Sequence, residues 1–171
     1  MALFQRETGS FPSNLVPFLT TLLFVMLSVV PLPIPGFAVV APAFALMAVY
    51  HWTIYRPELL PPTVVFVLGL VLDFMNAMPY VGISALSLLL TQQALLSVRR
   101  LFVNRLFPML WAGFLLTAVA MIAFQWGLVS MLSGRVLGTQ PFLFEAALAI
   151  PSFPIASYFL TRVQRTLLMR A

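Results

Sequence analysis

Long apolar runs that carry almost no charge constrain the fold of this chain more than any other feature. Hydrophobic residues make up 62% of the 171 positions and charged residues 8%, whereas a soluble domain carries about 25% charged residues. A membrane-spanning helix needs about 20 mainly apolar residues. The chain is therefore long enough for six such helices joined by short connections, and we predict an all-α polytopic membrane protein.

Interruptions of the apolar runs predict where each helix begins and ends. Pro31, Pro33 and Pro35 lack a backbone donor, so the first helix cannot continue through them. Short segments that contain arginine, glycine or proline separate the later runs. We expect one integral membrane domain over residues 1–171 that forms a six-helix transmembrane bundle. The expected helices cover residues 15–30, 37–55, 61–76, 81–98, 108–132 and 142–161.

The arginines predict the orientation of this bundle. If successive connections lie on alternate sides, Arg135 falls on one side and the other eight of the nine basic residues fall on the opposite side. Basic residues concentrate on the cytoplasmic side of membrane proteins, so we expect both termini to be cytoplasmic in a bacterial inner membrane. A nucleic-acid partner is not expected, because such a site needs a basic face with stacking aromatics. The eight are Arg6, Arg56, Arg99, Arg100, Arg105, Arg162, Arg165 and Arg170.

One segment places polar residues inside an apolar region. Asp73 is the chain's only aspartate, and a carboxylate at membrane depth is costly unless it is paired, hydrated or neutralised. Asn76 follows it, and Pro79 and Gly82 then interrupt the helix. We predict a hairpin of two helices, with Gly69, Asp73, Asn76, Pro79 and Gly82 as candidate structural or partner-contact residues. For Asp73 two alternatives stay open: a polar anchor or partner contact, or a carboxylate capped by nearby backbone amides.

The sole histidine lies in an aromatic group. His51 is flanked by Tyr50, Trp52 and Tyr55, and aromatic residues of this kind are enriched at membrane interfaces. A histidine can also titrate near neutral pH. We expect His51 and the three aromatic residues to lie at the interface.

Three further polar residues have two interpretations each. Glu145 lies near the start of the last expected helix, where the helix dipole favours an acid; catalysis is the alternative. Gln92 and Gln93 cannot face the same direction, so we expect at least one to form a hydrogen bond between helices. Ligand binding is the alternative for the glutamines.

The residue inventory does not favour an enzyme. A catalytic constellation needs a nucleophile, a base and an orienting group within reach, and the chain has one histidine, no cysteine and no lysine. We therefore expect no catalytic site, no metal site and no cofactor.

Several motifs resemble the MreD family of rod shape-determining membrane proteins. They are Tyr50-His51-Trp52, Arg56-Pro57, and the run from Gly69 through Asp73 to Phe74 with Gly82 after it. The resemblance implies a non-enzymatic membrane subunit of the bacterial cell-elongation complex, which supports cell shape and lateral peptidoglycan synthesis. It also implies a fold similar to the six-helix substrate-binding subunits of vitamin transporters.

The same resemblance implies partners. They are membrane lipids, a bitopic membrane protein of the MreC type and, indirectly, an actin-like filament of the MreB type and a peptidoglycan glycosyltransferase and transpeptidase. The alternative function is a substrate-binding subunit of an importer for a small, vitamin-like molecule. Such a subunit needs several polar side chains around an outward pocket, and Asp73, Asn76 and Glu145 are few for this purpose.

Overall fold

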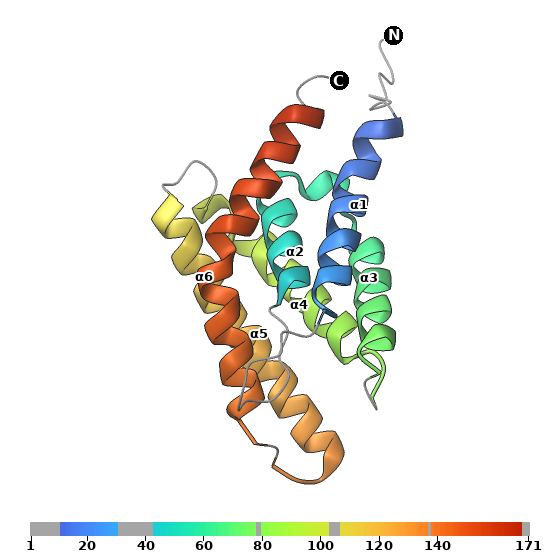
Figure 1. The fold of residues 1–171 in the computed structure, drawn as a ribbon, viewed down its shortest axis with the longest axis vertical. Helices are drawn as coiled ribbons and strands as arrows, with labels where there is room; N and C mark the ends of the chain where they lie inside the picture. Colours follow the sequence, from blue (N-terminus) through green and yellow to red (C-terminus); the bar gives the residue numbers. More distant parts are fainter. Residues whose placement is uncertain (1–10, 31–42, 78–79, 103–106, 137, 169–171) are drawn as a thin grey trace.

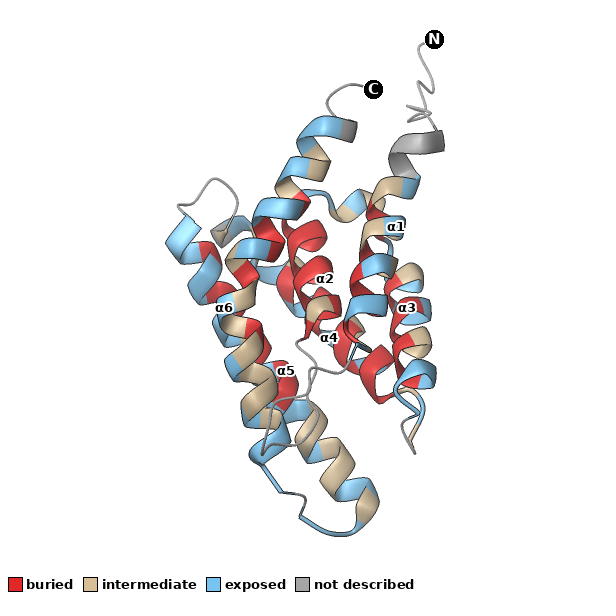
Figure 2. Cartoon of the chain, in the orientation of Figure 1, coloured by how far each residue is buried: buried red, intermediate tan, exposed pale blue. Residues whose placement is uncertain are grey.

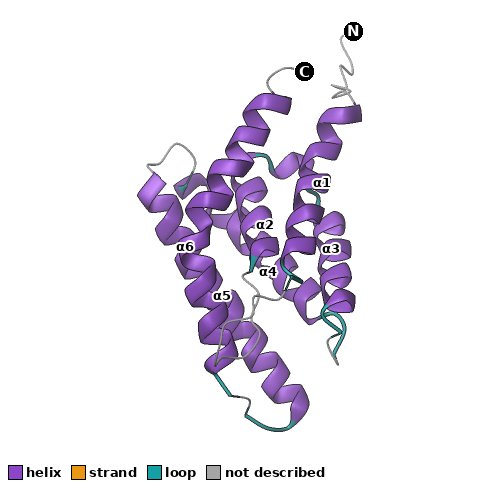
Figure 3. Cartoon of the chain, in the orientation of Figure 1, coloured by secondary structure: helices purple, strands orange, loops and turns teal. Residues whose placement is uncertain are grey.

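The structure is a computed structural model, and all of its regular elements within the described residues are helices (Figure 3). It describes residues 11–30, 43–77, 80–102, 107–136 and 138–168. The all-α class is thus confirmed for this part of the chain. The six α-helices are α1 (Phe11–Leu27), α2 (Phe44–Tyr55), α3 (Pro62–Met75), α4 (Ile83–Val98), α5 (Phe107–Ser133) and α6 (Gln140–Val163).

Three short helical turns complete the described elements. The turn η1 (Pro57–Leu59) links α2 to α3, η2 (Arg99–Leu101) follows α4, and η3 (Gln164–Leu168) continues α6. Proline at the first position of α3 suits a helix start, because its missing amide would have no intrahelical partner there.

The helices differ in their ability to cross a membrane. Among the described residues, two helical stretches of 27 residues each, Phe107–Ser133 and Gln140–Thr166, are long and apolar enough to do so. The helix α3 has 14 residues, which corresponds to a length of about 21 Å. This is shorter than a hydrocarbon core of about 30 Å. Six membrane spans therefore stay a prediction.

The helix α2 lies in the middle of the bundle (Figure 2). Every residue from Ala45 to Ile54 is buried, because α1, α4 and α6 all pack against this helix. A helix that is apolar on all sides is typical of such a central position. Tyr50 and Trp52 are 1% and 0% exposed, so they face other helices and not lipid, and their predicted depth at the membrane interface stays a prediction. Tyr55, at the end of the helix, is exposed.

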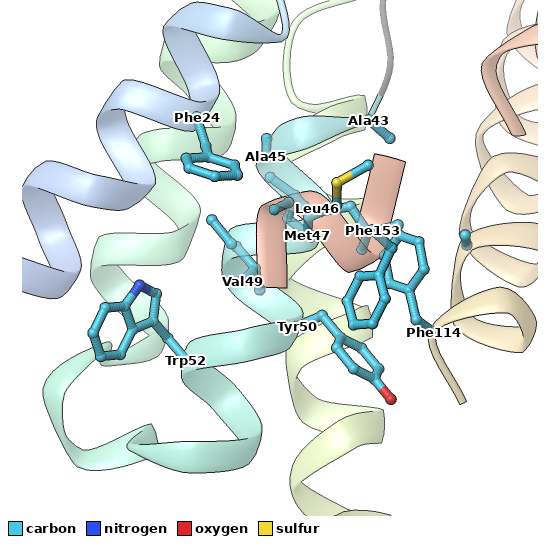
Figure 4. Packing of buried hydrophobic residues seen from close by; sticks show 14 of the residues in the cluster. Phe24, Ala43, Ala45, Leu46, Met47, Val49, Tyr50, Trp52, Phe114 and Phe153 are labelled. Carbon is cyan, nitrogen blue, oxygen red and sulfur yellow. The ribbon is translucent and has the colours of Figure 1, made fainter. Parts of the chain in front are cut away.

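An aromatic cluster joins α2 to the two longest helices (Figure 4). The ring of Tyr50 meets Phe114 of α5 and Phe153 of α6 edge to face, with centroids 5.5 and 5.6 Å away. The two phenylalanine rings stack on each other at 4.2 Å. The Tyr50 hydroxyl donates a hydrogen bond of 2.9 Å to the Leu110 carbonyl. The polar end of Tyr50 is thus satisfied inside the protein, which explains why it does not need to reach an interface.

The helices alternate in direction, so their connections fall at two ends of the bundle (Figure 1). The turns η1 and η2 and the end of α6 lie toward the end where α1 begins. The ends of α3 and α5 and the start of α6 lie at the opposite end. Of the described arginines, only Arg135 belongs to that opposite end, and Arg56, Arg99, Arg100, Arg162 and Arg165 belong to the first. The remaining arginines of the predicted asymmetry, Arg6, Arg105 and Arg170, lie outside the described residues.

Candidate functional site

Asp73 caps the N-terminus of the neighbouring helix α4. Its Oδ2 accepts hydrogen bonds from the backbone amides of Gly82, at 2.8 Å, and Ala85, at 3.4 Å. Its Oδ1 accepts one from the amide of Ser84 at 3.0 Å. The first amides of a helix have no intrahelical acceptor and carry the positive end of the helix dipole. The carboxylate and the helix end therefore satisfy each other.

The environment of Asp73 makes this interaction important. Asp73 is 0% exposed, whereas Glu145 is partly buried and Glu58 is exposed. No described arginine lies within 4.0 Å of the Asp73 carboxylate. The ion pair found among the described residues joins Arg56 and Glu58. These contacts agree with the second alternative for Asp73, a carboxylate that is capped by nearby backbone amides. Contact with a partner protein stays a prediction.

Gly82 shapes the backbone so that its amide can reach Asp73. Its φ angle of 105° lies in the left-handed region, which glycine adopts readily and other residues adopt at a cost. A side chain at this position would meet open space, so the constraint is the backbone conformation. Gly82 is thus the turn residue that starts α4.

Gly69 allows α3 and α4 to approach closely one turn before Asp73. A Cβ atom added to Gly69 would lie 2.9 Å from the backbone nitrogen of Ala85 and closer still to its Cα. The obstacle is backbone, which cannot move away as a side chain can. Gly69, Asp73 and Gly82 therefore form one structural unit, which we call the α3–α4 hairpin anchor.

Asn76, another candidate residue, does not join this unit. Asn76 is exposed and forms the C-cap of α3, where its backbone amide donates to the Leu72 carbonyl at 3.0 Å. Ala77 follows with a φ of 48° and begins the turn. Pro79 lies outside the described residues.

Polar side chains also fasten the end of α2 to three other elements. Trp52 Nε1 donates to Thr20 Oγ1 of α1 at 3.1 Å, and Arg99 Nε of η2 donates to the Ile54 carbonyl at 2.7 Å. His51 Nε2 and Gln164 Oε1 of η3 lie 3.2 Å apart. His51 is 1% exposed, so it is buried between helices, and its predicted depth at the membrane interface stays a prediction. The buried location follows from the central position of α2.

The predictions for the two glutamines and for Glu145 can be compared with the structure. Gln92 Nε2 donates to the Leu60 carbonyl, which precedes α3, at 2.7 Å, whereas Gln93 is exposed. The expected hydrogen bond was one between helices, and Gln92 instead bonds to the backbone of the connection that leads into α3. The helix α6 begins at Gln140 and has no acid in its first turn. Glu145 therefore lies beyond the turn where the dipole acts strongly, and the predicted dipole interaction is not supported.

Some anchoring residues were missed by the sequence reasoning. Ser28, just after α1, accepts a hydrogen bond from the Ala45 amide of α2 at 2.8 Å, as Asp73 does for α4. Arg99 was considered only for the topology, and Gln164 was not considered. Ser28 and Asp73 share one signal in the sequence. Each is a polar residue close to the end of an apolar helix.

The chemistry of these groups is that of packing and positioning. Within the described residues no three histidine, cysteine, aspartate or glutamate side chains come together as a metal site. Both oxygens of Asp73 are already engaged by amides. The arrangement holds helices in register, which is the property expected of a scaffold.

The comparisons with known proteins agree with this reading. The family model described as rod shape-determining protein MreD matches residues 10–163. No curated protein and no solved structure matches the chain, so the similarity to vitamin-transporter subunits stays a prediction. The family match extends from the first described helix to the end of α6 and includes the α3–α4 hairpin anchor. The chain therefore belongs to the MreD family of rod shape-determining membrane proteins.

Proposed function

We propose that the chain is a non-enzymatic subunit of the bacterial cell-elongation complex and supports lateral peptidoglycan synthesis as a membrane scaffold. The observation that carries this proposal is the family match over residues 10–163. The structure supports a scaffold role because the side chains of Asp73, Gln92 and Arg99 bind backbone atoms of neighbouring segments. Such contacts fix the shape of a bundle.

The proposed location is the bacterial inner membrane, with six spans and both termini in the cytoplasm. The arginines of the described residues support this orientation, since those at the end where α1 begins outnumber Arg135 at the other end. Arginine-rich ends face the cytoplasm. The short helices α1 to α4 could complete a span with residues of their connections or by local thinning of the bilayer.

The proposed direct partner is a bitopic membrane protein of the MreC type. Through it the chain would act on an MreB-type filament and on a peptidoglycan glycosyltransferase and transpeptidase. Large apolar side chains are exposed along α5, among them Leu116, 71% exposed, and Met131, 81% exposed. In a membrane such a face meets lipid or another helix, whereas the loops are too short to form a large soluble interface.

Depletion tests the proposed role in cell shape. Removal of the protein from a rod-shaped host should produce rounded cells with mislocalised wall insertion, and expression of the wild-type chain should restore the rods. The Asp73→Ala variant should restore them poorly, whereas Glu58→Gln, which alters an exposed ion pair, should restore them fully. Normal shape and normal wall insertion after complete depletion would contradict the proposal.

Copurification tests the proposed partner. The tagged chain should retain a single-span membrane protein of the MreC type in mild detergent. If an energy-coupling subunit copurifies instead and a vitamin-like ligand raises the melting temperature of the purified chain, the importer is the better function.

A further inference from the structure

The end of α6 collects cationic and hydroxyl groups around one pocket. The pocket has a volume of about 510 Å³. Its described lining consists of two arginines, two threonines and one tyrosine: Arg162, Arg165, Thr161, Thr166 and Tyr158. All of these side chains carry hydrogen-bond donors, and none of them carries a negative charge at neutral pH. The Thr161 hydroxyl donates to the Ser157 carbonyl at 2.8 Å, so the donors left for a ligand are those of the other four residues. The pocket is therefore suited to an anion.

The pocket lies on the face of α6 that points away from the bundle. On the opposite face Ser157 and Leu160 are buried, and Gln164 contacts His51 of α2. The two arginines and Tyr158 are thus on a different side of the helix from these bundle-facing residues, whereas Thr161, four residues after Ser157, lies at the edge between the two faces. The bundle fixes the helix, and the pocket face stays accessible.

The two arginines have no carboxylate partner in the part of the chain that the structure describes. The ion pair found there joins Arg56 and Glu58. Arg162 Nη1 donates a weak hydrogen bond of 3.3 Å to the Tyr158 hydroxyl, which orients the guanidinium along the pocket. Most guanidinium donors of Arg162 and Arg165 are thus available, and guanidinium groups bind phosphate oxygens in pairs.

An apolar side chain continues from the pocket toward the middle of α6. Ile155 lies about one turn before Tyr158 and is 75% exposed. Tyr158, 68% exposed, lies between Ile155 and the arginines. An exposed apolar group, then a tyrosine, then arginines follow the same order as acyl chains, interface and headgroup of a phospholipid.

We propose that this pocket binds an anionic phospholipid. Arg162 and Arg165, assisted by Thr166 and Tyr158, bind the phosphate, and the acyl chains lie along Ile155. Basic pockets at the cytoplasmic ends of membrane helices bind such headgroups. This inference rests on the proposed membrane placement of α6. It adds a defined lipid site that cell-shape assays do not test.

The experiment measures lipid binding to the delipidated full-length chain in neutral detergent by native mass spectrometry. Phosphatidylglycerol is titrated against phosphatidylcholine. The wild-type chain should bind phosphatidylglycerol more tightly, and the double variant Arg162→Gln, Arg165→Gln should lose roughly 30-fold in affinity, since each arginine near an anionic lipid contributes roughly fivefold. The matched control Arg135→Gln, an exposed arginine at the other end of the bundle, should lose less than twofold.

Three results would overturn the proposal. The first is a loss of less than twofold in the double variant, and the second is an equal loss in Arg135→Gln. The third is that soluble glycerol phosphate raises the melting temperature of the chain as much as phosphatidylglycerol does, which would indicate a site for a free phosphate compound.

If the double variant does not fold, a photoreactive phosphatidylglycerol is added to the wild-type chain. Labelling of residues 158–166 supports the site, and labelling elsewhere overturns it.

Discussion

Replacement of Asp73 by alanine should destabilise the protein more than any surface substitution. The carboxylate accepts two short hydrogen bonds, at 2.8 Å from Gly82 and 3.0 Å from Ser84. A hydrogen bond to a charged group contributes about 1.5–3 kcal/mol, so the two together predict a loss of about 3–6 kcal/mol. Hydrogen bonds measured inside membrane bundles average about 0.6 kcal/mol, which sets a lower limit of about 1.2 kcal/mol. The third bond, at 3.4 Å from Ala85, is too long to add much.

The free energy of unfolding can be measured on the purified full-length chain in mixed micelles, with tryptophan fluorescence as the signal. Asp73→Asn keeps one carbonyl oxygen and should lose about half as much as Asp73→Ala. Glu58→Gln is the matched control, because it removes a carboxylate whose exposed ion pair contributes at most about 1 kcal/mol. If Asp73→Ala and Glu58→Gln destabilise equally, the capping argument is wrong.

Further predictions concern the same hairpin and the topology. Gly69→Val should lower the free energy of unfolding by about 2 kcal/mol or more, because its side chain meets the backbone of Ala85; Gly127→Val, where a Cβ meets nothing within 4 Å, should change it by less than about 1 kcal/mol. Equal effects in thermal melts would refute the close-approach argument. Gly82→Ala should cost about 1–2 kcal/mol through its positive φ alone, and a melting temperature equal to that of the wild type would contradict this. Reporter fusions at either terminus should be active only as cytoplasmic reporters, and an extracytoplasmic terminus would exclude the six-span topology.

The α3–α4 hairpin anchor shows how much of the candidate site can be predicted from the sequence. An aspartate inside an apolar run must have a partner, and Gly82 after it indicates a turn, so the need for a polar contact there could be predicted. The identity of the partner could not, because two alternatives satisfied the same requirement. The structure brings the start of α4 beside Asp73 and thereby favours backbone amides.

The long apolar runs of the sequence predicted a helical membrane protein, because a helix satisfies all backbone hydrogen bonds of such a run within the run itself. The order of the residues also determined the arginine asymmetry and the position of the hairpin. Only the tertiary structure decided that α2 lies at the centre, that Tyr50 and Trp52 face other helices, and that Arg162 and Arg165 share a pocket. The physical reason is that an apolar helix face in a membrane protein suits lipid and protein equally well. Its amino acids do not reveal which of the two it meets, and packing between residues far apart in the chain makes that choice.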